Sequence, residues 1–214
     1  MTTNTLIKTC GIKDPQLAFA AAKAGADFIG LVFAEHSKRL VSLLQAAAIA
    51  QATCQAGAIP VAVFTNHTAK QMLAICQQAK ISWVQLHGDM ARQQHALLPE
   101  NFHCIYACTP ADNGELSDDD KAHIARLKLG RDYLLFDNAI AGSGKIFDWS
   151  SFSCQGELPW FLSGGLSIKN VGQGIEQLHP TGVDVSTGIE NEAGEKDLSY
   201  IQQFIDQVRG KLKL

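Results

Sequence analysis

Short apolar runs alternate with longer segments of helical spacing along the whole chain. Eight such runs occur, and each is followed by a polar turn and then by a helical segment. Nearly continuous apolar runs of this length are typical of parallel strands that are buried on both faces. The predicted strands are residues 5–10, 27–33, 59–64, 82–86, 102–107, 133–137, 159–162 and 183–186.

Eight repeats of strand and helix predict a parallel sheet that closes on itself. We therefore expect an α/β fold, a (β/α)8 TIM barrel, as a single domain over residues 1–214. Asp14-Pro15 is typical of a helix start, and Gly25 of a helix end. Residues 110–120 predict a solvated loop that leads into a helix. The last helix is expected to present one apolar face, formed by Leu198, Ile201, Ile205 and Val208.

Composition and charge exclude several classes of partner. The net charge of −3 gives no basic face, so we expect no nucleic acid partner. No apolar run is long enough for a membrane span, and the N-terminus does not resemble a signal peptide. The six cysteines form no C-x-x-C pair, which predicts reduced thiols and no metal site. These features predict a cytoplasmic protein.

Glycine-bearing turns follow the last two predicted strands. Ser163-Gly164-Gly165 follows the seventh strand, and Ser186-Thr187-Gly188 follows the eighth. Glycine lets backbone N–H groups approach a ligand closely, and two such turns after strands seven and eight are typical of a phosphate site in a barrel. The alternative is that each is only a tight turn. We predict that phosphate is bound by Gly164, Gly165, Ser186, Thr187 and Gly188.

Polar side chains also stand at the ends of other predicted strands. Cys10 ends the first strand, Arg39 lies in the loop after the second, His87 follows the fourth, and Asp137 ends the sixth. In a closed barrel the carboxyl ends of the strands form the active-site face. We therefore expect these side chains to belong to one site.

The chain resembles the phosphoribosylanthranilate isomerase family of tryptophan biosynthesis. The resemblance consists of sequence blocks that follow one another in the family's order and span nearly the whole chain. They are Lys8-Thr9-Cys10-Gly11, Gly25-Ala26-Asp27-Phe28-Ile29-Gly30, Ser37-Lys38-Arg39-Leu40-Val41-Ser42, Val61-Ala62-Val63-Phe64, Val84-Gln85-Leu86-His87-Gly88, Gly142-Ser143-Gly144-Lys145-Ile146-Phe147-Asp148-Trp149, Leu162-Ser163-Gly164-Gly165-Leu166, Gly182-Val183-Asp184-Val185-Ser186-Thr187-Gly188-Ile189-Glu190 and Gly194-Glu195-Lys196-Asp197.

The resemblance implies an Amadori rearrangement by acid–base catalysis, without a cofactor or metal. It assigns the base to Cys10 and the acid to Asp137. Lys8, on the same strand face as Cys10, is expected to lower the thiol's pKa, and the apolar run before Asp137 is expected to raise the carboxyl's pKa. Without the resemblance, Cys10 is typical of a buried small residue and Asp137 of a turn-capping carboxylate.

The remaining contacts are expected from the resemblance and from the places of these residues at the strand ends of a closed barrel. Arg39 is expected to bind the anthranilate carboxylate or to be a solvated loop arginine, and Lys38 stands where the family usually has proline. His87 is expected to line the site or to be a core histidine. We predict that Asp184 belongs to the site and contacts Lys8. The loop at residues 141–145 is expected either to close over the substrate or to be a plain loop.

Two other functions stay open. A related isomerase could act on an aminoimidazole ribotide, but that class usually has an aspartate on the first strand, where this chain has Cys10. A barrel that binds a phosphorylated ligand without converting it is the other alternative. In all three cases the expected partner is a small phosphorylated molecule, and the protein is expected to be a monomer or a homodimer.

Overall fold

The computed structural model describes residues 5–111, 114–137, 149, 152, 154 and 156–210. Its eight strands follow one another in chain order and close into a barrel. Each predicted strand is present, and each predicted end lies within one residue of the observed end. The prediction of a (β/α)8 barrel is therefore confirmed. The strands are β1 (Leu6–Cys10), β2 (Phe28–Val32), β3 (Ile59–Phe64), β4 (Trp83–Leu86), β5 (His103–Cys108), β6 (Asp132–Phe136), β7 (Trp160–Leu162) and β8 (Gly182–Val185).

The chain divides into two compact units. Residues 8–107 form one of them, which we call the N-terminal unit. Residues 5–7 join the described residues from 108 onward in the other, the C-terminal unit. The single domain over residues 1–214 stays a prediction.

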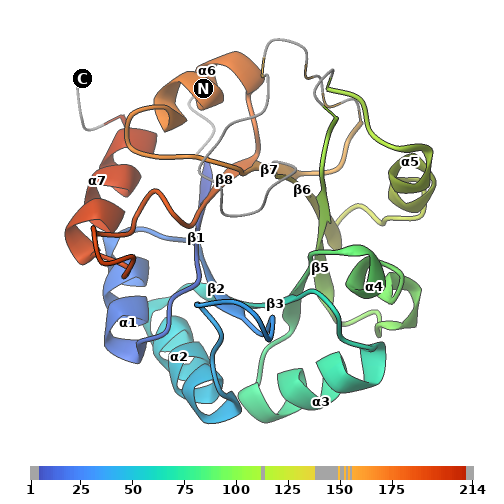
Figure 1. Ribbon diagram of the computed structural model, residues 1–214, viewed down its shortest axis with the longest axis horizontal. Coiled ribbons are helices and arrows are strands. Elements are labelled where there is room, and N and C mark those ends of the chain that lie inside the picture. The colour runs from blue at the N-terminus through green and yellow to red at the C-terminus, as the bar shows by residue number, and fades with distance from the viewer. Residues whose placement is uncertain are drawn as a thin grey trace. The chain divides into compact units, whose positions relative to one another are not determined.

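In the N-terminal unit, helices cover the outer side of parallel strands. Figure 1 shows α1 (Pro15–Ala24), α2 (Leu43–Ala56) and α3 (Ala69–Ala79) outside β2 and β3. The predicted start of α1 is confirmed, because the Asp14 carboxylate accepts a hydrogen bond of 2.7 Å from the Leu17 amide and Pro15 is the first helical residue. Gly25 ends α1, as predicted. Capping boxes that begin at Ser42 and Thr68 start the next two helices.

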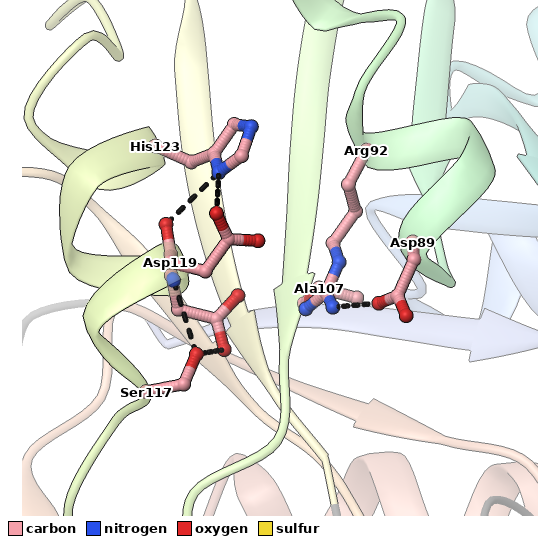
Figure 2. Close-up of polar contacts among 7 residues, drawn as sticks. Asp89, Arg92, Ala107, Ser117, Asp119 and His123 are labelled. Atoms are coloured by element: carbon pink, nitrogen blue, oxygen red, sulfur yellow. Dashed lines mark hydrogen bonds and ion pairs between the residues drawn. The ribbon is translucent and has the colours of Figure 1, made fainter.

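The short helix α4 (Asp89–Arg92) is tied to the end of β5. The Arg92 guanidinium donates to the carbonyl of Ala107 at 3.1 Å. It also pairs with Asp89, as the dashed line in Figure 2 marks. The same guanidinium lies 5.7 Å from the centre of the Tyr106 ring. A 3₁₀ helix (His95–Leu97) follows α4. One arginine thus fixes the carboxyl end of a strand to the helix that precedes it.

In the C-terminal unit, the beginning of the chain is held by residues near its end. The Leu6 amide donates to the Thr181 carbonyl at 3.0 Å, and Arg209 donates to the Thr5 carbonyl at 2.6 Å. Helices α6 (Val171–Leu178) and α7 (Leu198–Val208) lie outside β7 and β8 in Figure 1. Residues 5–7 are therefore fixed by backbone contacts with the C-terminal half of the sequence.

Helix α5 (Asp118–Ile124) begins earlier than predicted. The acidic residues 118–120 were expected in a loop, but they form the first turn of the helix. The Ser117 hydroxyl accepts from the Asp120 amide at 3.1 Å and donates to the Asp120 carboxylate at 2.9 Å. His123 Nδ1, one turn later, lies 2.9 Å from the Asp119 carbonyl oxygen. A serine cap and acidic residues in a first turn both stabilise a helix start.

The buried face of α7 differs from the prediction. Ile201 and Ile205 are buried as expected, and Phe204 is buried beside them. Leu198 is 45% exposed, because it is the first residue of the helix and precedes the buried stripe. Val208 is partly exposed. The apolar face is therefore shorter than the predicted one and is centred on Phe204.

No helix among the described residues combines the length and the apolar character that crossing a membrane requires. The strands supply more buried hydrophobic residues than the helices do, and their central side chains are nearly inaccessible in both units. Examples are Ile29, Val61 and Val84 in the N-terminal unit, and Leu135 and Phe161 in the C-terminal unit.

Candidate active site

Cys10 lies at the carboxyl end of β1, where a glycine on the next strand makes room for it. Its side chain is 7% exposed, and Cys10 is the direct neighbour of Gly30 in the parallel register of β1 and β2. A Cβ atom on Gly30 would lie 2.7 Å from the Cys10 Sγ and 3.1 Å from its Cα. Such distances are too short for a side chain, so the thiol occupies the space that Gly30 leaves free.

Gly11 follows Cys10 and provides the surface on which Arg39 lies. Its φ of +82° is in the left-handed region, where glycine is favoured. A Cβ there would overlap the Arg39 Cδ and would lie 3.3 Å from Cγ. The Arg39 amide donates to the Ser37 hydroxyl at 3.1 Å, and Lys13 donates to the Lys38 carbonyl at 3.3 Å. The structure therefore brings Arg39 next to the strand end that carries Cys10.

His87 follows β4 and is half-buried, so it is not enclosed in the core. Its amide donates to the Phe64 carbonyl at 2.8 Å, which continues the pairing of β3 and β4. Its ring Nδ1 lies 3.4 Å from the Gln85 amide nitrogen. These contacts fix the start of the loop after β4, while the role of the ring in a site stays a prediction.

Asp137, in the C-terminal unit, directly follows β6 and is half-buried. Its amide donates to the Cys108 carbonyl at 3.0 Å. The preceding residues, Leu134, Leu135 and Phe136, are each at most 3% exposed. Asp137 therefore directly follows the most deeply buried part of β6, at the strand end where it was predicted.

The turn after β7 has an unusual backbone. Gly164 and Gly165 have consecutive φ values of +82° and +70°. Among the described residues, no hydrogen bond of the turn uses the N–H group of either glycine. Asn170 braces the turn, since it accepts from the Ser167 amide at 2.8 Å and donates to the Gly165 carbonyl at 2.9 Å. Successive N–H groups in a turn are able to form a concave anion-binding surface.

The turn after β8 packs directly on the turn after β7. Gly188 forms a parallel bridge with Ser167. A Cβ on Gly188 would overlap the Leu166 carbonyl oxygen and would lie 2.9 Å from the Ser167 Cα, so no larger residue fits there. The Ser163 hydroxyl, from the first turn, donates to Asp184 on β8 at 3.3 Å. The two glycine turns are thus side by side, and their use for phosphate stays a prediction.

Two charged residues next to these turns received no role from the sequence. Lys196 donates from Nζ to the Ser186 carbonyl at 2.8 Å and to the Ser186 hydroxyl at 3.0 Å. Its Nζ also lies 3.0 Å from the Glu190 carboxylate. Both residues belong to sequence blocks that carry the family resemblance, and this could have marked them as candidates. Their spacing in the sequence does not indicate that they contact Ser186.

Two further expectations have no structural answer. The loop at residues 141–145 lies outside the described residues. Lys8 is fully buried and Asp184 is 6% exposed, and the contact predicted between them stays a prediction.

Comparison with known proteins identifies relatives along nearly the whole chain. The profile described as N-(5'phosphoribosyl)anthranilate (PRA) isomerase matches residues 7–207. An N-(5'-phosphoribosyl)anthranilate isomerase of Chlamydia caviae is 40% identical over 93% of this chain and 94% of its own.

Solved structures agree with the sequence relatives. A phosphoribosyl anthranilate isomerase of Thermotoga maritima superposes with a TM-score of 0.80 at 30% identity, over 96% of this chain and 99% of its own. A second such isomerase, solved with reduced 1-(o-carboxyphenylamino)-1-deoxyribulose 5-phosphate, has a TM-score of 0.76 at 28% identity and the same coverage. The chain therefore belongs to the N-(5'-phosphoribosyl)anthranilate isomerase family.

Proposed function

We propose that Cys10 and Asp137 are the base and the acid of the reaction that this family catalyses. Membership of the family makes the chain an isomerase of tryptophan biosynthesis, acting on N-(5'-phosphoribosyl)anthranilate. The observation that supports Cys10 most directly is the space that Gly30 leaves for its thiol at the end of a barrel strand. Asp137 is supported by its place where β6 ends.

The reaction needs two proton transfers that side chains can supply. Asp137, in its protonated form, gives a proton to the furanose ring oxygen. The bond from that oxygen to C1′ breaks, and the anthranilate nitrogen forms a C=N bond to C1′. The Cys10 thiolate then removes the proton from C2′, and the released electron pair forms a C1′=C2′ bond while the nitrogen becomes neutral. The resulting enolamine tautomerises to 1-(2-carboxyphenylamino)-1-deoxyribulose 5-phosphate. Each positioned proton transfer typically contributes about 10²–10⁴-fold to the rate.

The two glycine turns support a phosphate site. The consecutive N–H groups of Gly164 and Gly165 would donate to phosphate oxygens, together with Thr187 and Gly188 from the second turn and the Ser186 hydroxyl. In the N-terminal unit, the Arg39 guanidinium would pair with the anthranilate carboxylate. His87 and Asp184 would line the substrate. The partner is thus a small phosphorylated molecule, and the predictions of a cytoplasmic monomer or homodimer are retained.

The test follows the fluorescence of freshly prepared N-(5'-phosphoribosyl)anthranilate. The wild-type chain should consume it, while Cys10→Ala and Asp137→Asn should each lower kcat by about 10²–10⁴-fold. Cys54→Ala is the matched control, because Cys54 is an exposed cysteine on α2 and should leave kcat unchanged. A fully active Cys10→Ala or Asp137→Asn variant would refute the assigned roles. Absence of turnover by the wild-type chain with intact substrate would refute the function itself.

A further inference from the structure

Lys196 is presented to the turn after β8 by a tight hairpin. Glu190 and Lys196 form an antiparallel bridge, and the Asn191 amide donates to the Glu195 carbonyl at 2.8 Å. Gly194 has a φ of +75°, which the reversal between them requires. The hairpin therefore returns the chain to Ser186 immediately after it has left the turn.

The ammonium group of Lys196 has an oxygen partner for each of its three protons. Two of these are on Ser186, the backbone carbonyl at 2.8 Å and the hydroxyl at 3.0 Å. The third is the Glu190 carboxylate, at 3.0 Å from Nζ. The two charged side chains are only 7% and 8% exposed, so both charges are largely removed from water. An ion pair in this setting contributes little net stability, because desolvation offsets much of the attraction between the charges.

The contact also fixes the direction in which the Ser186 hydroxyl points. An ammonium group can only donate, so the Ser186 oxygen must accept from Lys196 and its own proton must point away from Nζ. The Ser186 backbone is fixed at the same time, because its carbonyl accepts from the same nitrogen. Lys196 thus determines both the position of Ser186 and the side of its hydroxyl that can donate.

We propose that Lys196 is a positioning residue of the phosphate site and acts through Ser186. It orients the serine hydroxyl as a donor to the 5′-phosphate of the substrate and adds positive charge behind the turn. The two contacts with Ser186 hold the ammonium group in place, and Glu190 partly neutralises its charge. The inference rests on the proposed function, in which Ser186 and its neighbours bind the phosphate.

The test removes the buried pair without leaving a single charge unpaired. The variant is Glu190→Gln/Lys196→Met, in the full chain, with Lys121→Met as the matched control because Lys121 pairs with Asp118 on an exposed helix surface. Steady-state kinetics would give KM and kcat separately for the substrate. Inhibition assays would give the inhibition constants of inorganic phosphate and of anthranilate. We expect KM and the phosphate inhibition constant to rise roughly tenfold or more, with kcat and the anthranilate constant little changed.

Two further variants separate positioning from a purely structural role. When Ser186 is alanine, Glu190→Gln/Lys196→Met should raise the inhibition constant of inorganic phosphate much less than it does in the wild-type chain. The reason is that the hydroxyl that Lys196 orients is already missing. Glu190→Gln alone should lower the phosphate constant, since the positive charge is no longer balanced.

Three results would overturn the proposal. They are an unchanged phosphate constant in the paired variant, an equal rise in both backgrounds, or a rise in Glu190→Gln. Failure of the wild-type chain to convert the substrate is a separate result, because it contradicts the proposed function.

Discussion

Cys10 depends on a neighbour that has no side chain. Gly30 lies directly across from it, and a methyl group there would be 2.7 Å from the sulfur. We expect Gly30→Ala to displace the thiol and to lower kcat by about tenfold or more, since small misplacements of a catalytic group are costly. Steady-state kinetics with the fluorescent substrate would measure this effect.

The control for this substitution is Gly57→Ala or Gly130→Ala, because no atom lies within 4 Å of a Cβ built at either position. Both controls have positive φ and should lose some stability, yet they should keep the wild-type kcat. A Gly30→Ala variant that folded normally and kept full activity would contradict the prediction that catalysis depends on the space left for the Cys10 thiol.

Ser117 makes two hydrogen bonds with Asp120 at the start of α5. Its hydroxyl accepts from the Asp120 amide and donates to the Asp120 carboxylate, and Asp120 is only 5% exposed. Ser117→Ala should lower the free energy of unfolding by about 1–2 kcal/mol, because a cap and a donor to a buried carboxylate are lost together. Urea unfolding would measure this loss.

The network at α5 is separate from the proposed catalytic residues, so kcat should not change in Ser117→Ala. Ser117→Thr is the control, since it keeps the hydroxyl and is expected to retain most of the stability. An alanine variant with the wild-type unfolding midpoint would mean that water replaces the cap without cost.

The elements that the sequence predicts well are those whose signal is local. Each strand is a short buried run, and Asp14-Pro15 and Gly25 mark the ends of α1 by their own backbone chemistry. The errors arise where the outcome depends on distant neighbours. Leu198 has helical spacing with Ile201 and Ile205, yet the buried stripe begins only after it.

The same difference applies to the candidate site. Positions at strand ends, such as Cys10 and Asp137, follow from the barrel alone. The contact of Lys196 with Ser186 spans ten residues and depends on a hairpin that brings the two together, so neither periodicity nor composition contains it. Likewise, the packing of Arg39 on Gly11 appears only in the folded structure, because the two are 28 positions apart in the sequence.

The reactivity of the buried Cys76 thiol should report on the unfolding of the protein. It is 1% exposed on the inner face of α3, and burial raises its pKa from 9.0 to about 12. The thiolate is the reactive form, so at pH 8 the folded thiol would be ionised only to about 1 part in 10⁴. We expect iodoacetamide to modify exposed Cys54 readily and Cys76 only after unfolding, as measured by mass spectrometry.

The raised pKa of Cys76 makes the stability of the folded protein depend on pH. Because the folded state holds the Cys76 proton more tightly, the stabilisation is complete below pH 9 and is lost as the pH rises toward 12. The rate of Cys76 modification should therefore increase with urea in parallel with unfolding, and Cys54 should show no such dependence. Rapid labelling of Cys76 in the native protein would contradict its burial.

The attachment of residues 5–7 to the C-terminal unit has a consequence for synthesis on the ribosome. The amide of Leu6 needs the carbonyl of Thr181, and the carbonyl of Thr5 needs the guanidinium of Arg209. Both partners are translated after the whole of the N-terminal unit. Thr5 and Leu6 of the nascent chain therefore stay without these native partners until Thr181 and Arg209 have been made, whereas residues 8–107 can gather into their unit before that.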